Sequence, residues 1–232
     1  MLTRTPIELT TTRTGSGRDS RMAPPVARSG LGGALEMMGA RMSFARNEEI
    51  YGEDEPADYV YKVLSGAVRV CKLLDDGRRQ ITAFHLPGDM FGLEAGEHHR
   101  VSAEAIVNSS ILVVKRSAVI ALAASDADVA RQLWTTTAKN LERVQDHMLL
   151  LGCMSARERV AAFLLAMAGR APRADEIELP MSRQDVADYL GLTIETVSRT
   201  LTQLEHDAAI GLATARRIVL RNRAALASGL AG

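Results

Sequence analysis

The segment 180–204 constrains the fold more than any other part of the chain. Ser182 stands three residues before Asp185, an arrangement that caps the start of a helix because the two side chains satisfy free backbone N–H groups. Gly191 permits a tight turn, and Thr193 is placed to cap a second helix. A helix, a short turn with glycine and a second helix form the helix-turn-helix pattern, so we expect this segment to bind DNA.

The predicted second helix has two contrasting faces at about 100° per residue. Glu195, Ser198 and Arg199 share one face in its N-terminal half, which in a recognition helix contacts base edges. A carboxylate accepts from cytosine N4 and a guanidinium donates to guanine O6 and N7, so Glu195 and Arg199 are predicted to read G·C pairs. The alternative is an exposed Glu195–Arg199 ion pair that contributes only about 0.3–0.5 kcal/mol. The opposite face is predicted to be buried and carries Ile194, Val197, Leu201 and Leu204.

A β-hairpin is predicted after this helix, with strands over 210–212 and 217–221. A helix-turn-helix followed by such a hairpin is a winged helix. Residues 153–232 hold ten basic and nine acidic residues, so DNA binding has to rest on the local placement of arginines. The residues predicted to contact phosphates, which set register rather than sequence, are Ser182, Arg183, Thr193, Thr196, Arg216, Arg217 and Arg221.

The N-terminal half has the period of two that is typical of β-strands. From Tyr59 onward, apolar and polar residues alternate in short runs that are separated by turns at 75–77 and 86–89. Short strands at this spacing predict a small barrel or sandwich over about 40–118. Residues 1–30 are rich in Thr, Ser, Gly, Pro and Arg without apolar periodicity, and we expect a disordered tail there.

A long helix is predicted between these two parts, with Ser125 capping its start and Gly152 ending it in the left-handed conformation. Ser155 and Glu158 then form a capping box for the next helix. The apolar seam of the long helix follows a heptad repeat, which predicts a symmetric dimer; the alternative is that the seam packs on the β-domain. The predicted dimer-interface residues are Trp134, Thr137, Leu141, Val144, Met148 and Leu151.

Composition is that of a soluble globular protein. Basic and acidic residues balance at 28 each, no apolar run nears the roughly 18 residues of a membrane span, and no signal pattern opens the chain. We therefore expect a cytoplasmic protein with no membrane partner. The predicted segments are a tail over 1–30, a β-domain over 31–124, a dimerisation helix over 125–152 and a DNA-binding domain over 153–232.

The chain has two cysteines, too few for a four-cysteine metal site. Cys71 lies in a strand pattern and is predicted to belong to the core. Cys153 lies at the helix junction and is a candidate redox-sensitive thiol, with an unreactive side chain as the alternative. The run 97–99 is predicted to be an exposed turn rather than a metal site. Because no nucleophile–base spacing, phosphate loop or metal-binding helix motif occurs, we expect no enzyme, no metal and no cofactor.

The runs YKVLSGAVRV over 61–70 and QITAFHLPGD over 80–89, with the long helix and the segment 182–204, resemble the cyclic-AMP receptor protein/fumarate-nitrate reduction regulator (CRP/FNR) superfamily. The resemblance covers about 40–225. Glu195, Ser198 and Arg199 match the E-x-x-S-R of the fumarate-nitrate branch, Ile194 stands where the cyclic-AMP branch has arginine, and the whole is most similar to FixK-type regulators.

This resemblance implies an α+β fold with an N-terminal jelly-roll domain of the cyclic-nucleotide-binding kind, here called the β-roll, a dimerisation helix and a C-terminal winged helix-turn-helix. It implies a homodimeric bacterial transcription activator that binds palindromic TTGAT-type sites, with Ser198 adding discrimination, and that recruits RNA polymerase. Control of microaerobic respiration or nitrogen fixation is the expected role.

Two departures from the family bear on its effectors. The stretch 92–100 is shortened, and His99-Arg100 stands where nucleotide-binding members have Arg-Ser or Arg-Thr, so we expect no cyclic nucleotide. No cysteine precedes Cys71, so the N-terminal cysteine group of the iron–sulfur sensors is missing. The alternative is a ligand- or haem-dependent sensor whose DNA binding requires an effector. The sequence leaves the input signal and the target genes open.

Overall fold

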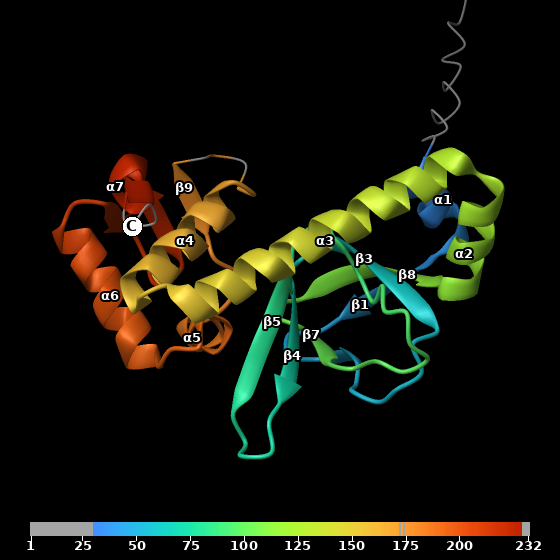
Figure 1. Ribbon diagram of the computed structural model, residues 1–232, viewed down its shortest axis with the longest axis horizontal. Coiled ribbons are helices and arrows are strands. Elements are labelled where there is room, and N and C mark those ends of the chain that lie inside the picture. Colours follow the sequence, from blue (N-terminus) through green and yellow to red (C-terminus); the bar gives the residue numbers. More distant parts are fainter. Residues whose placement is uncertain (1–29, 172, 174, 229–232) are drawn as a thin grey trace, which may run out of the picture.

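The computed structural model describes residues 30–171, 173 and 175–228, and its order of elements is strands, a long helix and a helical domain with a small sheet. In Figure 1 the long helix α3 (Ala127–Cys153) crosses the molecule, with the strands of the N-terminal half below it and the C-terminal helices at its end. The predicted α+β fold class is confirmed. The predicted tail lies outside the described residues except for Gly30.

The β-roll consists of two antiparallel four-stranded sheets. Alternating side chains of both sheets, among them Val63, Val70 and Ile111, form an apolar core between them. Two helices that the periodicity did not predict flank the strands, α1 (Leu31–Met38) and α2 (Arg116–Ser125). The sheet orders are β1 (Ala40–Phe44), β8 (Ser109–Lys115), β3 (Tyr59–Ser65), β6 (Met90–Phe91) and β2 (Glu49–Tyr51), β7 (Ser102–Ala105), β4 (Val68–Leu73), β5 (Arg79–His85).

The ends of α3 differ from the prediction in two details. Asp126 caps the helix by accepting from the N–H groups of Asp128 and Val129, while the Ser125 hydroxyl donates to carbonyls of the preceding helix α2. Gly152 stays inside α3 without a positive φ, and the extended residue Met154 ends the helix. An extended residue ends the helix as effectively as a left-handed glycine because it also breaks the i to i−4 ladder. The predicted capping box at the start of α4 (Ala156–Ala168) is confirmed.

The C-terminal domain contains the predicted helix-turn-helix, α5 (Arg183–Leu190) and α6 (Ile194–His206). The predicted hairpin is confirmed as β10 (Ile210–Leu212) and β11 (Arg217–Leu220), and α7 (Arg223–Ser228) follows it. A third strand, β9 (Glu176–Glu178), pairs with β11 and was not predicted, since three residues are too few to show a period.

The core of the C-terminal domain continues into the β-roll. Phe163 and Leu164 of α4 and Val197 of α6 belong to the same buried cluster as Ile81 and Phe84 of β5. Burial of side chains from two domains in one core restricts their relative movement. In the described part of the chain, no helix has the length and apolar character needed to cross a membrane.

Candidate nucleic-acid interface

The caps and the turn of the helix-turn-helix have the predicted geometry. The Ser182 hydroxyl accepts from the Asp185 N–H at 3.1 Å, and the Asp185 carboxylate accepts from the Ser182 N–H at 2.9 Å. Gly191 has φ +61°, a left-handed conformation that a side chain would strain. Thr193 caps α6 by accepting from the Thr196 N–H at 3.2 Å. These local bonds fix the path of the chain from α5 into α6.

One face of α6 is buried and the other is exposed. Val197, Leu201 and Leu204 are buried, as predicted. Ile194 was predicted to be buried and is 37% exposed, because it occupies the first turn of α6, where the helix projects beyond the core. Glu195 and Arg199 are exposed and Ser198 is half-buried. The N-terminal half of α6 therefore presents a carboxylate, a hydroxyl and a guanidinium outward.

Glu195 and Arg199 do not pair with each other among the described residues. The Arg199 guanidinium instead donates to the Thr196 hydroxyl at 3.5 Å, a long and weak contact. The Thr196 hydroxyl also lies 3.0 Å from that of Thr193. The exposed ion pair that was the alternative to base reading is therefore not formed, and both charged groups are open to a ligand.

The predicted phosphate-contacting residues lie in different environments. The Ser182 hydroxyl donates to the Asp185 carboxylate at 2.7 Å, so its proton is engaged within the protein. Arg183 is half-buried and lines a small crevice together with Ala215 of the hairpin turn. The start of α5 and the turn of the hairpin therefore lie close together.

The three arginines of the hairpin are exposed, and they differ in their partners. Arg217 forms an ion pair with Glu176 of β9, and its side-chain hydrogen bond lowers the pKa of that carboxyl. Arg221 lies across Gly211, where an added Cβ would meet its guanidinium at 2.9 Å. Arg216 follows Thr214, whose hydroxyl accepts from its backbone N–H. Arg217 is thus partly neutralised by a residue that the sequence did not single out.

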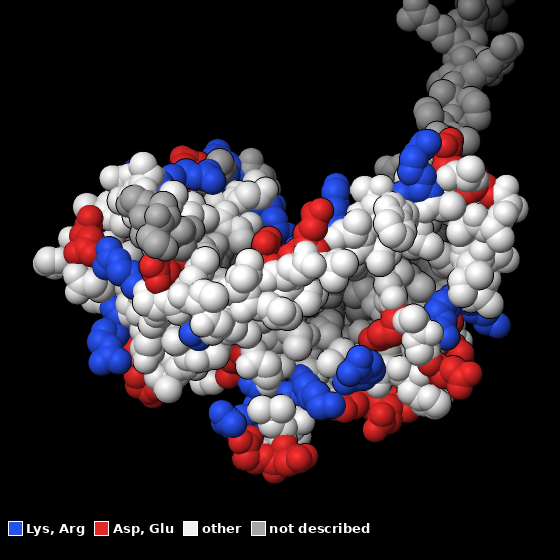
Figure 2. Space-filling view, viewed as in Figure 1, with Lys and Arg blue, Asp and Glu red and all other residues white. Residues whose placement is uncertain are grey.

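The heptad seam of α3 is bare in the single chain. Trp134 is 75% exposed, and Leu141, Val144 and Met148 are also exposed. Figure 2 shows a largely uncharged strip along α3. Leu151 differs from these residues, because it is half-buried against the C-terminal core. The seam therefore offers a largely apolar exposed surface from Trp134 to Met148 and joins the domain core at Leu151.

The interior of the β-roll is occupied by the chain's own aromatic rings. Tyr51 stacks on His99 at 3.6 Å between ring centroids, and Tyr61 stacks on Phe91 at 5.1 Å. An added Cβ at Gly92 would lie 2.7 Å from the Tyr61 ring. Burial raises the pKa of Tyr61 to about 12, so its phenol stays neutral.

His99 contradicts the prediction of an exposed turn at 97–99, since it is 1% exposed. Glu97 and His98 are exposed as predicted. The His99 Nδ1 lies 2.6 Å from the Glu94 carboxylate, which explains how a polar ring is held inside the roll. A turn rich in polar residues gave no signal that one of them points inward.

The cysteines lie where the sequence indicates. Cys71 is buried, and burial raises the pKa of its thiol to about 11, so it stays protonated. Cys153 is exposed at the end of α3. In the part of the chain that the structure describes, no group of three His, Cys, Asp or Glu side chains is arranged to hold a metal ion.

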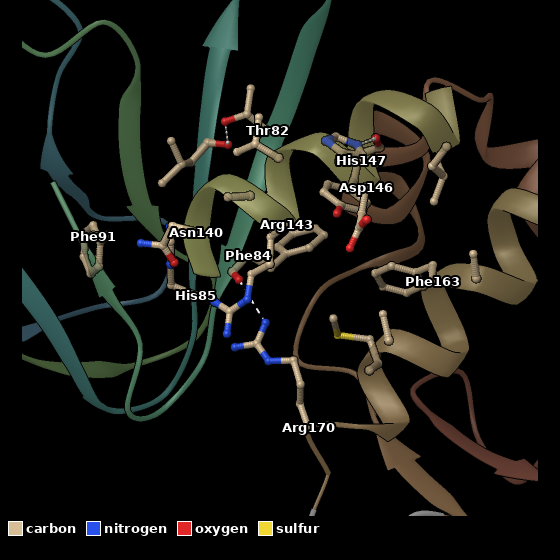
Figure 3. Close-up of a pocket in the computed structure, with 18 of the residues that line it drawn as sticks. Thr82, Phe84, His85, Phe91, Asn140, Arg143, Asp146, His147, Phe163 and Arg170 are labelled. Carbon is tan, nitrogen blue, oxygen red and sulfur yellow. Dashed lines mark hydrogen bonds between the residues drawn. The ribbon is translucent and has the colours of Figure 1, made fainter. Parts of the chain in front are cut away.

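A cavity of about 780 Å³ lies between β5, α3 and α4. Figure 3 shows Phe84 and His85 on one side of it, His147 above and Phe163 opposite. Burial lowers the pKa of His85 to about 4, so this ring is neutral at physiological pH. His147 donates from Nε2 to the Tyr189 carbonyl at 2.8 Å and stacks on the Tyr189 ring. The cavity thus adjoins both the β-roll and the helix-turn-helix.

Comparison with known proteins identifies both parts of the chain. Residues 41–126 match the cyclic nucleotide-binding domain, and residues 158–228 match the Crp-like helix-turn-helix domain. The chain is 54% identical over 194 residues to the nitrogen fixation regulation protein FixK of Azorhizobium caulinodans, covering 82% of this chain and 78% of that protein. It is 42% identical over 198 residues to FixK of Rhizobium meliloti, covering 84% and 90%.

Among solved structures, that of FixK2 from Bradyrhizobium japonicum matches with a TM-score of 0.79 and 57% identity, covering 82% of this chain and 96% of that one. The similarity therefore spans the β-roll, the long helix and the helix-turn-helix together.

Proposed function

The chain belongs to the CRP/FNR family of transcription regulators, and from this premise we propose that it is a homodimeric activator that binds palindromic TTGAT-type promoter sites and recruits RNA polymerase. It is a FixK-type transcription regulator with a helix-turn-helix domain and not an enzyme. Its proposed role is control of nitrogen fixation or of microaerobic respiration. The names of its FixK relatives, which are nitrogen fixation regulation proteins, support the first of these roles.

The observation that carries the proposal is the exposed face of α6. Glu195 and Arg199 are one turn apart, open to solvent and unpaired with each other, as side chains that accept from cytosine and donate to guanine need to be. Ser198 lies between them and tunes the discrimination. Arg183, Arg216 and Arg221 flank this face and anchor phosphates, while Arg217 contributes less because Glu176 already pairs with it.

The bare apolar seam of α3 supports the homodimer. Exposed tryptophan, leucine, valine and methionine at heptad spacing are stabilised when a second copy covers them. In such a dimer, a twofold axis at the α3 seam relates the DNA-reading face of one protomer to that of its partner. The binding site is then a palindrome with half-sites about one helical turn apart.

The filled β-roll supports activity without a cyclic nucleotide. The rings of Tyr51, Tyr61, Phe91 and His99 occupy its interior, and the carboxylate of Glu94 points toward them. These residues do not fit a nucleotide, since the Glu94 carboxylate would repel a phosphate and the rings already fill the interior. The absence of any cysteine before Cys71 likewise supports activity without an iron–sulfur cluster. The exposed Cys153 is the proposed redox-sensitive position.

An effector-dependent regulator is the second candidate, and the cavity between β5, α3 and α4 favours it. Its volume of about 780 Å³ is in the range that holds small ligands. A haem in this protein would give a Soret absorption band in the purified sample. A colourless sample that binds DNA tightly without additions would remove this candidate.

The test is a salt titration of binding to a TTGAT-N4-ATCAA duplex and to a scrambled duplex, with thiols reduced and no ligand added. We expect tight binding to the palindrome, with an affinity at least about a thousandfold above that for scrambled DNA. Weak and equal binding to both duplexes would contradict the proposal of an effector-free activator that reads TTGAT.

A further inference from the structure

The first helix of the helix-turn-helix is tied to the β-roll by a group of ion pairs, here called the latch. Asp185 is 4% exposed and accepts from Arg69 of β4 at 3.1 Å and from Arg79 of β5 at 2.8 Å. Arg79 also donates to the Asp188 carboxylate at 2.9 Å, and the Gln80 amide donates to the Asp188 carbonyl at 2.9 Å. More than one hundred residues separate the two sides, so the latch joins domains and not neighbours in sequence.

Asp185 is ionised in the latch. Burial alone raises the pKa of a carboxyl, yet hydrogen bonds from Ser182 and the charges of Arg69 and Arg79 hold the pKa of Asp185 below its usual range. Glu104 accepts from the Arg69 Nε at 2.9 Å, so the buried guanidinium has a carboxylate on each side. Separating such a buried ion pair leaves a charge without a partner, which is unfavourable. The pair therefore holds its two elements in one arrangement.

Two further contacts hold the same domain from other directions. Arg159 donates to the Leu151 carbonyl at the end of α3 and to the Leu190 carbonyl at the end of α5. Asp89, after β5, pairs with Arg143 of α3 and with Arg170 beyond α4. Figure 3 shows the side chains of Arg143 and Arg170 converging beside Phe84 and His85. The position of α5 is thus fixed relative to both the β-roll and the helix proposed to carry the dimer axis.

The latch does not cover the DNA-reading face. Glu195 and Arg199 stay exposed on α6, while the latch engages Asp185 and Asp188 of α5. The contacts therefore set where the face points and leave it accessible. Since α5 leads into α6 through the fixed turn at Gly191, an orientation set at Asp185 is passed to the reading helix.

We propose that the latch of Arg69, Arg79, Asp185 and Asp188 sets the half-site spacing that the dimer accepts. This inference rests on the proposed function, because it concerns how two reading helices are held relative to each other. One added base pair turns a half-site by about 34° and moves it by about 3.4 Å. A latched domain cannot follow that displacement. Without the latch, the shared apolar core and the contacts of Arg159 and Asp89 still hold the domain, but less tightly, so that it has more freedom to turn about the junction of α3 and α4. Arg79 and Asp188 are accordingly positioning residues that determine spacer specificity.

The experiment compares anisotropy binding curves of full-length wild-type protein, Arg79→Ala and Asp188→Asn on TTGAT palindromes with spacers of three, four and five base pairs. We expect the wild-type affinity to fall about tenfold or more when the spacer changes by one base pair, as when one half-site loses its base contacts. For each latch variant, the affinity is expected to fall by less than about threefold when the spacer changes by one base pair. Each variant is also expected to bind the palindrome with the four-base-pair spacer more weakly than wild type does. Arg78→Ala is the matched control, because Arg78 pairs with Asp76 in its own turn and forms no ion pair or hydrogen bond with the residues of the C-terminal domain that the structure describes.

A loss of overall stability lowers all affinities together and leaves the spacer ratio unchanged, so an unchanged ratio in both latch variants overturns the inference. Asp188→Asn keeps the shape of the side chain, so the spacer ratio can be measured on this variant if Arg79→Ala does not fold.

Hydrogen exchange without DNA is a readout that does not depend on the half-site. Faster exchange of the α5 amides in Arg79→Ala than in Arg78→Ala supports the latch, and equal exchange overturns it. Failure of the wild-type protein to prefer any TTGAT palindrome over scrambled DNA would refute the proposed function instead.

Discussion

The two helices of the helix-turn-helix have similar starts and opposite uses of charge. Both begin at a hydroxyl cap, Ser182 for α5 and Thr193 for α6, and both bury an apolar stripe. The carboxylates of α5, Asp185 and Asp188, are bound by arginines of the β-roll. The charged groups in the N-terminal half of α6, Glu195 and Arg199, are exposed to solvent. A charge that already has a protein partner fixes position, and a charge without one is available to a ligand.

This contrast explains why a neutral chain is able to bind a polyanion. Basic and acidic residues are equal in number, and Figure 2 shows both signs mixed over the visible face. Many of the acidic groups form ion pairs with arginines or lysines of the same chain, so the arginines that lack such partners are the ones proposed to position DNA. The predictions below test the contrast, from the largest expected effect to the smallest.

Arg69→Met is expected to lower the free energy of unfolding by about 3 kcal/mol, because it leaves Asp185 and Glu104 close together without the guanidinium between them. Urea denaturation followed by circular dichroism measures this loss. Arg78→Met removes a fully exposed ion pair with Asp76 and is expected to leave the free energy of unfolding nearly unchanged. Similar losses in the two variants would show that the latch contributes no more than a surface pair.

Arg199→Ala is expected to weaken binding to the palindrome by about 1–3 kcal/mol and to relax the preference for guanine at one position. The melting temperature should stay unchanged, since Arg199 is exposed and makes only a long contact with Thr196. Competition binding with single-base variants of the site measures both effects. An equal loss on scrambled DNA would mean that Arg199 contacts a phosphate and not a base.

Removing the cap of each helix compares how much α5 and α6 depend on their capping side chains. Ser182→Ala and Thr193→Ala are each expected to reduce stability by about 1 kcal/mol, the usual cost of losing a cap. Ser182→Ala should cost more, because the Ser182 hydroxyl also donates to Asp185 at 2.7 Å. Chemical denaturation of the two variants under identical conditions gives the difference. A larger loss of stability for Thr193→Ala would contradict this expectation and would show that α6 depends more on its cap than α5 does.

The same distinction between paired and available charge applies within the hairpin. Arg216→Ala is expected to reduce the slope of log K against log salt by about 1, as for the loss of one phosphate contact. Arg217→Ala should reduce it less, because Glu176 already pairs with that guanidinium. Salt titrations of both variants on the same duplex measure the slopes. A larger change for Arg217→Ala would show that DNA displaces Glu176.

Much of the local structure was predictable from the sequence where neighbouring residues determine it, although the predicted ends of α3 at Ser125 and Gly152 were wrong. The capping boxes at Ser155 and Ser182 and the left-handed turn at Gly191 depend on side chains within four residues of one another. The two faces of α6 likewise follow from helical geometry alone, apart from Ile194 at its exposed first turn. The candidate base-reading residues could therefore be named before any tertiary structure was known.

Partners that are distant in the chain were decided by the tertiary structure alone. Asp185 reads in sequence as a helix cap, and only packing of α5 on β4 and β5 gives it Arg69 and Arg79. Arg217 reads as a phosphate contact until β9 brings Glu176 beside it. His99 reads as part of a polar turn until the β-roll closes around it. An ionisable side chain does not carry the identity of its partner, because electrostatic attraction depends on distance in space and not on separation along the chain.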